Sequence, residues 1–469
     1  MKIATNFRKN LLVATLGKYA GIAIALLSLM ILSRLVEPRL HGYIAYVAVF
    51  ITFYELLVDS YYGASFLVHK RITKNELAQD YMANYRIGLI IFLIGVLFCG
   101  ILIDNVRDKI MIILFFPFIL VLRGHLKIEQ IVARRELNFK VIAYGDILSG
   151  ICSLLVGSIV AYYYPLLGLL IYQISLPLIN LIYLIAQQGS VLFNIYLNRN
   201  ISINLSAEAK ILDERFTHDS KMQLYTGISI FAFRNLDNFL VGIFFGPAKL
   251  GLYDKSYKAI MMPIRLIPGV LNGVLLPSFD SNDAKSLQRS YYRILKVLAP
   301  TGVIVSILLF EFSRVIVSIL LGDSWKESII YVRIFAVSMP LQMINIVAAP
   351  FFQARSKVAL LFRLSVVNAI LVISTLIISA ALFDSILDTI IAVQFVFMIM
   401  PFMYYYVLNK YVFERKRIIE YHHIFLCFLS SIVMLCIYLE MIKFSAINNI
   451  LLLYSAVLLI TNKDIRRFL

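Results

Sequence analysis

Apolar stretches of about 20 residues, separated by short polar segments, recur along the whole chain. An α-helix rises about 1.5 Å per residue, so about 20 residues cross the hydrocarbon core of a bilayer. The pattern predicts fourteen membrane-spanning helices, at 11–33, 42–60, 86–103, 110–122, 141–163, 166–186, 224–245, 257–276, 294–312, 328–350, 360–383, 386–408, 422–441 and 447–461. The sequence therefore predicts an all-α integral membrane protein.

A polar segment at 187–222 divides these spans into two groups of six, with two further spans at the C-terminal end. The segment mixes acidic with basic residues and has no apolar stretch of spanning length. We expect the chain to be organised as an N-terminal six-helix half, a cytoplasmic linker, a second six-helix half and two additional helices, at 1–186, 187–222, 223–409 and 410–469.

A similar motif follows the first and the seventh predicted spans. It reads Pro38-x-x-x-Gly42 in the first copy and Pro247-x-x-x-Gly251 in the second, each with a tyrosine one or two residues later. We expect the proline to stop one helix and the glycine to allow the turn that starts the next. The recurrence six spans apart predicts an internal duplication, and parallel repeats of this kind occur in transporters whose halves alternately open a central site.

Composition and charge agree with a membrane protein. Of 469 residues, 61% are hydrophobic and 15% are charged, whereas a soluble domain is about a quarter charged. If the N-terminus is cytoplasmic, thirty Lys and Arg residues fall on the cytoplasmic side and ten on the outer side. The net charge of +17 thus follows the positive-inside rule and does not indicate nucleic-acid binding. We expect a multi-pass protein of the inner, or plasma, membrane with a cytoplasmic N-terminus.

Charged residues inside the predicted spans are the candidate functional residues, because a charge at mid-membrane costs about 2.5–3.5 kcal/mol on insertion scales. They concentrate in spans one, two, seven and eight. They are Lys18, Glu55, Asp59, Arg234, Asp237 and Arg265, with Asn235 and Asn238 beside them. Other charged residues, Asp146, Glu311 and Arg333, are nearer the interfaces or lack an evident partner, and we expect them to reach toward the interface.

Two interpretations of these charges remain open. In the structural one, Lys18 pairs with Glu55 or Asp59, and Arg234 pairs with Asp237. In the functional one, the cationic and amide side chains line a cavity that attracts an anionic head group, and a carboxylate titrates or binds a coupling cation. The head-group candidates are Lys18, Arg234, Asn235, Asn238 and Arg265, and the coupling candidates are Glu55, Asp59 and Asp237.

Several segments resemble the Wzx-type polysaccharide flippases, in particular the colanic-acid and teichuronic-acid exporter branch of the multidrug/oligosaccharidyl-lipid/polysaccharide exporter superfamily. The segments are RNLDNFLVG at 234–242, LGLY at 250–253, SRLVEP at 33–38 and LGDSW at 321–325. The resemblance implies two six-helix bundles around a central V-shaped cavity lined by spans one, two, seven and eight.

The same resemblance implies a substrate and partners. The substrate is an isoprenoid pyrophosphate-linked oligosaccharide, flipped from the cytoplasmic to the outer leaflet for the synthesis of surface polysaccharide such as lipopolysaccharide O-antigen or exopolysaccharide. Arginines that face a pyrophosphate make chemical sense. Membrane lipid, a polysaccharide polymerase and glycosyltransferases are the implied partners.

Two alternatives are a cation-coupled multidrug exporter of the same superfamily and a membrane glycosyltransferase or polymerase. The cationic residues in the spans favour an anionic lipid-linked glycan over a cationic drug. The outer segments are short and contain no D-x-D, and no P-loop, G-x-G-x-x-G, H-E-x-x-H or G-x-S-x-G occurs. The sequence therefore predicts no enzyme, no catalytic residue, no metal site and no cofactor, with H⁺ or Na⁺ as the possible coupling ion.

Overall fold

The computed structural model describes residues 2–59, 74–135, 138–189, 218–270, 283–414, 422–439 and 455. Within these ranges the chain is helical and contains no β-strand. Ten helices in this part of the chain are long and apolar enough to cross a bilayer. These ten helices correspond to ten of the fourteen predicted spans. The prediction of an all-α membrane protein is therefore confirmed. The predicted span 447–461 lies outside the described residues, apart from Ser455.

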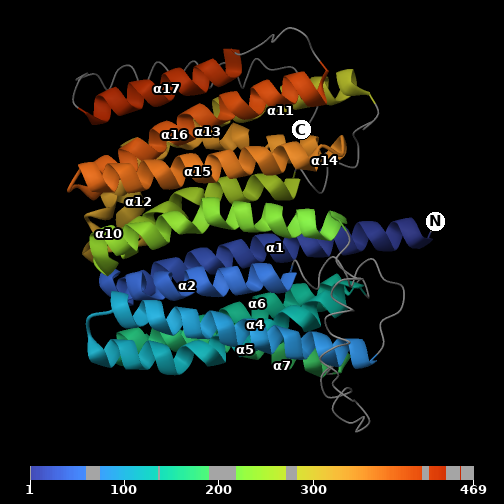
Figure 1. The fold of residues 1–469 in the computed structure, drawn as a ribbon, viewed down its shortest axis with the longest axis vertical. Helices are drawn as coiled ribbons and strands as arrows, with labels where there is room; N and C mark the ends of the chain where they lie inside the picture. The colour runs from blue at the N-terminus through green and yellow to red at the C-terminus, as the bar shows by residue number, and fades with distance from the viewer. Residues whose placement is uncertain are drawn as a thin grey trace. The chain divides into compact units, whose positions relative to one another are not determined.

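The chain forms two compact units, Met1–Gly251 and Leu252–Leu469. The first unit contains α1 (Lys2–Leu35), α2 (Pro38–Val58), α4 (Lys74–Leu102), α5 (Val106–Arg135), α6 (Phe139–Tyr163), α7 (Pro165–Gln188) and the first part of α10 (His218–Val270). Figure 1 shows α4 to α7 side by side: α5 packs on α4 and α7, and α6 packs on α7 and α1. The boundary between the units lies inside α10. Most of the predicted 187–222 linker, 190–217, lies outside the described residues, so the predicted division of the chain stays a prediction.

The second unit has a core of its own. Its helices are the rest of α10, α11 (Ala284–Glu311), α12 (Ser313–Leu320), α13 (Ser328–Asn345), α14 (Ala348–Ala354), α15 (Val358–Leu382), α16 (Ile386–Val407) and α17 (His422–Tyr438). Buried aromatic side chains from α11, α14 and α16, among them Tyr291, Phe351 and Tyr405, fill the centre. Ser306 of α11 donates a hydrogen bond to the Ala336 carbonyl of α13, which joins the two helices.

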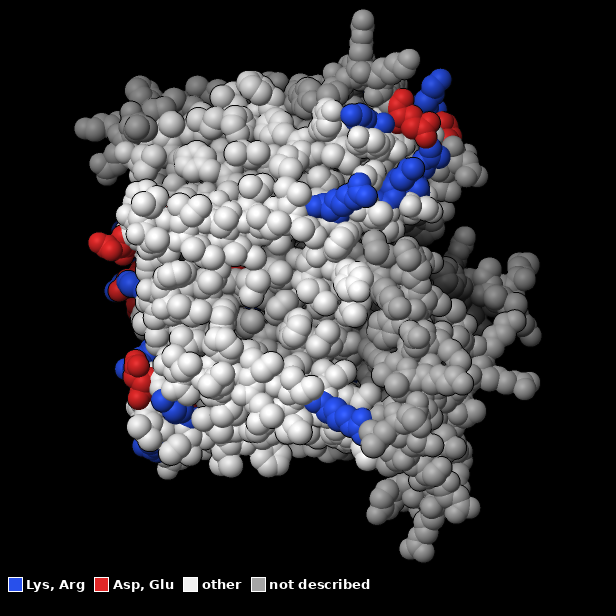
Figure 2. Space-filling view, viewed as in Figure 1, with Lys and Arg blue, Asp and Glu red and all other residues white. Residues whose placement is uncertain are grey.

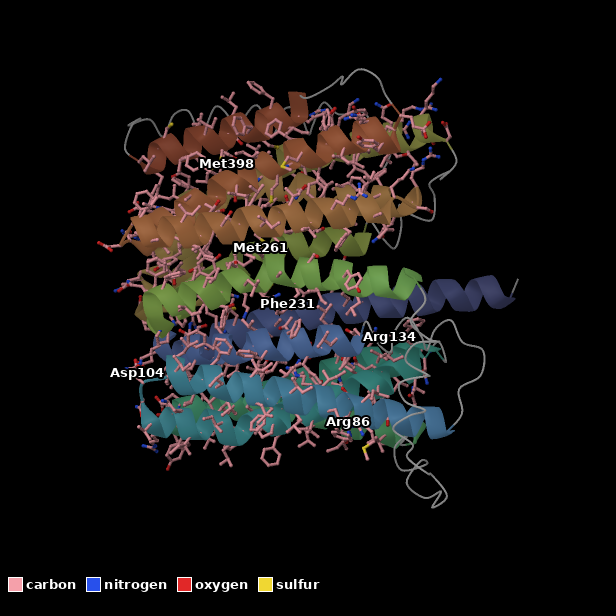
Figure 3. All side chains as sticks on the ribbon, viewed as in Figure 1. Arg86, Asp104, Arg134, Phe231, Met261 and Met398 are labelled. Carbon is pink, nitrogen blue, oxygen red and sulfur yellow. The ribbon has the colours of Figure 1, made fainter. Side chains whose placement is uncertain are left out.

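Apolar side chains cover the outside of the first unit along its helices. Leu89, Leu93 and Leu97 follow one side of α4 at four-residue spacing and are 58%, 58% and 63% exposed, as expected for a surface that faces lipid. On the face shown in Figure 2, charged side chains gather toward the helix ends. Figure 3 shows Asp104 at the turn between α4 and α5, and Arg134 near the opposite end of α5.

Helix α5 is much longer than the predicted span at 110–122. It runs from Val106 to Arg135, so Arg123 and Lys127, which follow the end of the predicted span, are part of the helix. At about 1.5 Å per residue the helix is roughly 45 Å long, well over the roughly 30 Å of the hydrocarbon core. Its last turns therefore carry basic side chains within the bundle.

The repeated proline starts a helix in both copies, which corrects the expectation that it stops one. Pro38 is in the first turn of α2, where its missing N–H leaves no hydrogen bond unmade. In α10, Gly246 has a positive φ of 81° and breaks the helix, and Pro247 follows it at the start of the next helical segment. The two predicted spans 224–245 and 257–276 are thus the two segments of α10, as far as Val270.

Candidate functional site

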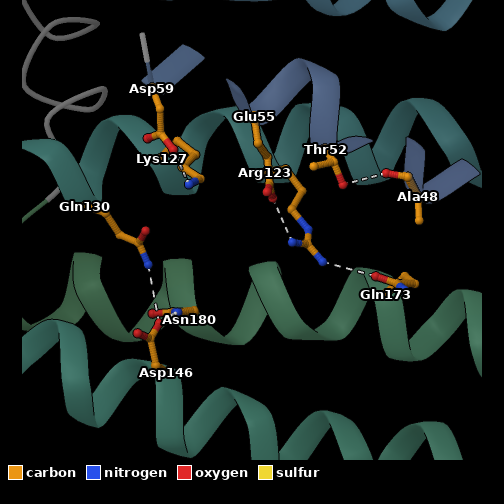
Figure 4. Close-up of polar contacts among 10 residues, drawn as sticks. All are labelled: Ala48, Thr52, Glu55, Asp59, Arg123, Lys127, Gln130, Asp146, Gln173 and Asn180. Atoms are coloured by element: carbon orange, nitrogen blue, oxygen red, sulfur yellow. Dashed lines mark hydrogen bonds and ion pairs between the residues drawn. The ribbon is translucent and has the colours of Figure 1, made fainter. Parts of the chain in front are cut away.

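Two ion pairs connect α2 to α5 in the first unit. Glu55 lies in the last turn of α2, and Asp59, four residues later, is the helical C-cap of α2. Arg123 and Lys127 lie four residues apart on α5, so each pair of charges shares one helix face. The Arg123 Nη1–Glu55 Oε1 distance and the Lys127 Nζ–Asp59 Oδ2 distance are both 2.7 Å. We call these four side chains the α2–α5 charge cluster (Figure 4).

Arg123 connects the charge cluster to a third helix. Its Nη2 donates a hydrogen bond to Gln173 Oε1 of α7 at 3.1 Å, while Nη1 binds Glu55. The side chains of Arg123 and Glu55 are 20% and 21% exposed, so other protein atoms cover most of the pair. One guanidinium therefore ties α2, α5 and α7 together.

The structural interpretation named the wrong partner for the α2 carboxylates. It paired Lys18 of α1 with Glu55 or Asp59, whereas Arg123 and Lys127 pair with these two carboxylates, and Lys18 is exposed on α1. The positive-inside rule led to this error, because it treats basic residues near a span as loop residues. The signal that was available is the equal four-residue spacing of the two acidic and the two basic residues.

A second polar cluster joins α5, α6 and α7. Asp146 Oδ1 of α6 accepts hydrogen bonds from Asn180 Nδ2 of α7 at 2.7 Å and from Gln130 Nε2 of α5 at 3.4 Å. Figure 4 shows both contacts. Asp146 is therefore held by neighbouring helices, which corrects the expectation that it has no partner and reaches toward the interface.

The candidate residues on α10 lie in the first unit, except Arg265. Asp237 is buried, 5% exposed, and its Oδ1 accepts the backbone N–H of Asn238 at 2.7 Å. Asn235 Nδ2 donates to the Phe231 carbonyl at 3.1 Å. The side chains of Arg234 and Arg265 lie outside the described part, so their predicted roles, and the predicted pair of Arg234 with Asp237, stay predictions.

The two Pro-x-x-x-Gly motifs cross each other in the first unit. A Cβ placed on Gly42 would lie 1.8 Å from the Pro247 carbonyl oxygen, and one on Gly251 would lie 1.9 Å from the Pro38 carbonyl oxygen. Each glycine thus lets the backbone of the other motif approach, so the duplicated motifs bind one another reciprocally. We call this contact the Pro-Gly crossing.

The contact between α2 and α10 continues beyond the Pro-Gly crossing. Tyr46 donates a hydrogen bond to the Gly242 carbonyl at 2.8 Å, and the rings of Phe53 and Phe231 pack with their centroids 5.0 Å apart. Residue numbers rise along α2 as they fall along α10, so the helices run antiparallel. The helix that carries Asp237 is therefore packed along the helix that carries Glu55 and Asp59.

The α2–α5 charge cluster predicts a measurable coupling. Glu55→Gln and Arg123→Gln should each lower the stability by about 2 kcal/mol, since each leaves one partly buried charge without its partner. The reversed pair, Glu55→Arg with Arg123→Glu, should recover at least about 1 kcal/mol of that loss. Thermal melting of the purified protein in detergent measures all three variants. A reversed pair that loses as much stability as the two single variants combined would contradict the direct contact.

A model of the family described as "Polysaccharide biosynthesis protein" matches residues 31–330, which include α2, the charge cluster and α10. The chain belongs to this family. Its relatives include the teichuronic acid biosynthesis protein TuaB of Bacillus subtilis (strain 168), at 20% identity over 61% of this chain, and the lipopolysaccharide biosynthesis protein WzxC of Escherichia coli (strain K12), at 22% identity over 76%. The matched regions span 58% of TuaB, less than two thirds of its length, and 72% of WzxC.

Solved structures share the fold at low sequence identity. The Lipid II flippase MurJ, in an inward closed conformation, matches with a TM-score of 0.68 and 12% identity, over 96% of this chain and 97% of MurJ. An inward-facing multidrug resistance MATE family transporter of the MOP superfamily matches with a TM-score of 0.57 and 13% identity, over 85% of this chain and 96% of that transporter. The resemblance to Wzx-type flippases is confirmed by the family model and the sequence relatives, and the solved structures agree in fold. Family and fold together indicate a membrane transporter and not an enzyme, as the sequence predicted.

Proposed function

We propose that the protein flips an isoprenoid pyrophosphate-linked oligosaccharide from the cytoplasmic to the outer leaflet by alternating access. The observation that carries the proposal is the family match over 31–330, combined with a fold similar to a lipid flippase over 96% of the chain. In this proposal the protein resides in the plasma membrane with a cytoplasmic N-terminus, and H⁺ or Na⁺ is the coupling ion. A polysaccharide polymerase and glycosyltransferases act before or after it.

The residues in the membrane helices support an anionic head group. Arg234 and Arg265 lie on α10, and Lys18 lies on α1, each within a predicted span. Guanidinium groups bind phosphates through two parallel N–H donors, and in a membrane a cation is stable only near an anion or water. Asn235 and Asn238 add amide groups on α10, and Asp237 is the α10 carboxylate proposed for ion coupling.

A multidrug exporter is the alternative, because the MATE fold is also similar. A deletion strain distinguishes the two. We expect loss of a surface polysaccharide, accumulation of its lipid-linked repeat units and unchanged susceptibility to cationic drugs and dyes. Restored polysaccharide on expression of the intact chain is the control. Increased drug susceptibility with normal surface polysaccharide would contradict the flippase proposal and support drug export.

A further inference from the structure

The α2–α5 charge cluster places two cations next to each other inside the first unit. Arg123 and Lys127 are one helical turn apart, which corresponds to about 6 Å of rise along α5. Each is held by a carboxylate of α2, through Nη1 and Nζ respectively. The pair therefore presents two positive groups on one face of α5, one helical turn apart along the axis.

Arg123 has hydrogen-bonding capacity that its partners do not use. Its Nη1 binds Glu55 and its Nη2 binds Gln173, while Nε is buried and has no partner among the described residues. A guanidinium has five N–H donors, and a buried donor without an acceptor costs free energy. Arg123 therefore has an unused N–H donor for a further anionic oxygen.

The cluster is open enough for exchange. The side chains of Arg123 and Lys127 are each 20% exposed, and that of Asp59 is 40% exposed. An ion pair with this exposure is weaker than a sealed one, because water screens it. An anion with a higher charge than a carboxylate therefore competes with Glu55 and Asp59 for Arg123 and Lys127.

We infer that Arg123 and Lys127 form a diphosphate-binding site, which Glu55 and Asp59 occupy as counter-ions when no diphosphate is bound. The inference rests on the proposed function and adds to it a site on α5, a helix that the head-group prediction left out. Arginine binds one phosphoryl group through paired N–H donors, and the lysine ammonium binds the second as a compact charge.

Binding at this site also reaches α10. Displacement of Glu55 and Asp59 removes the ionic attachment of α2 to α5, while the Pro-Gly crossing keeps α2 attached to α10. Diphosphate binding then leaves α2 attached to α10 without its two ion pairs to α5. This gives the head group a direct effect on the helix that contacts α10.

Thermal melting of the purified full chain with inorganic pyrophosphate tests the inference. Melting is compared with sodium sulfate at matched ionic strength, so that a general salt effect is subtracted. The intact chain should be stabilised by pyrophosphate in a saturable manner. Glu55→Gln with Asp59→Asn should melt lower without ligand and bind pyrophosphate about tenfold more tightly, because the competing carboxylates are gone.

Two further variants complete the test. Arg123→Gln with Lys127→Gln should weaken pyrophosphate binding at least tenfold, whereas Lys285→Gln with Arg289→Gln, two exposed cations of α11, should leave it unchanged. Equal binding by the intact chain and the carboxylate variant would overturn the inference, and so would no binding by either. If the deletion strain still accumulates lipid-linked repeat units in that case, the site assignment is wrong while the proposed function stands.

Discussion

Gly42→Ala should prevent the first unit from folding, or destabilise it by roughly 3 kcal/mol or more, because the new Cβ meets backbone atoms. The ideal Cβ position lies 1.8 Å from the Pro247 carbonyl oxygen and 2.6 Å from its carbonyl carbon. A backbone carbonyl of a packed helix cannot turn aside as a flexible side chain can. Gly251→Ala should have the same effect, since its Cβ meets the Pro38 carbonyl oxygen at 1.9 Å.

The matched control is Gly21→Ala in α1, where a Cβ meets nothing within 4 Å. There alanine should be neutral or should stabilise the helix by up to about 1 kcal/mol, because glycine is a poor helix former. The yield of monodisperse protein and its melting temperature measure both substitutions. If Gly42→Ala and Gly21→Ala behave alike, α2 and α10 do not cross at the two motifs.

The second large effect is expected at Arg234 and Arg265. Arg234→Gln and Arg265→Gln should each abolish restoration of surface polysaccharide in the deletion strain, a loss of at least about a hundredfold if each guanidinium makes one charge-assisted contact worth about 3 kcal/mol. Glutamine keeps a polar side chain but removes the positive charge. Membrane insertion and protein level should stay normal, because replacing a charged side chain in a membrane helix by a neutral one lowers the cost of insertion.

Arg289→Gln is the control for this prediction, since Arg289 is a basic residue of α11 whose side chain is 71% exposed. It should restore polysaccharide as well as the intact chain does. Immunoblotting of membranes establishes equal amounts of every variant. Unimpaired polysaccharide in both α10 variants would exclude these arginines from the head-group site and leave the α5 cations as the site to test.

The sequence predicted the spans well because their length and apolar character are local properties. Helices such as α6 and α15 end within a few residues of the predicted spans. The prediction failed for α5, where basic residues that resemble a loop continue the helix because α2 supplies carboxylates for them. Arg123 and Glu55 are 68 residues apart in the chain, so their pairing depends on how the helices pack. A local sequence pattern does not determine that packing.

The repeated motif illustrates a different limit. The sequence identified Pro38-x-x-x-Gly42 and Pro247-x-x-x-Gly251 as copies, and it assigned each glycine to a turn. In the structure the positive φ belongs to Gly246, while Gly42 and Gly251 lie within helices where another backbone approaches. A glycine that serves a turn and one that serves a close contact look alike in sequence, so only the packing separates the two roles.

The most direct measurement of the central claim is the side of the membrane on which lipid-linked repeat units reside. In spheroplasts, a membrane-impermeant oxidant of sugar diols modifies only units that have reached the outer leaflet. We predict that units in the deletion strain are protected from the oxidant, and that expression of the intact chain makes them accessible. Units equally accessible with and without the protein would contradict the flippase account.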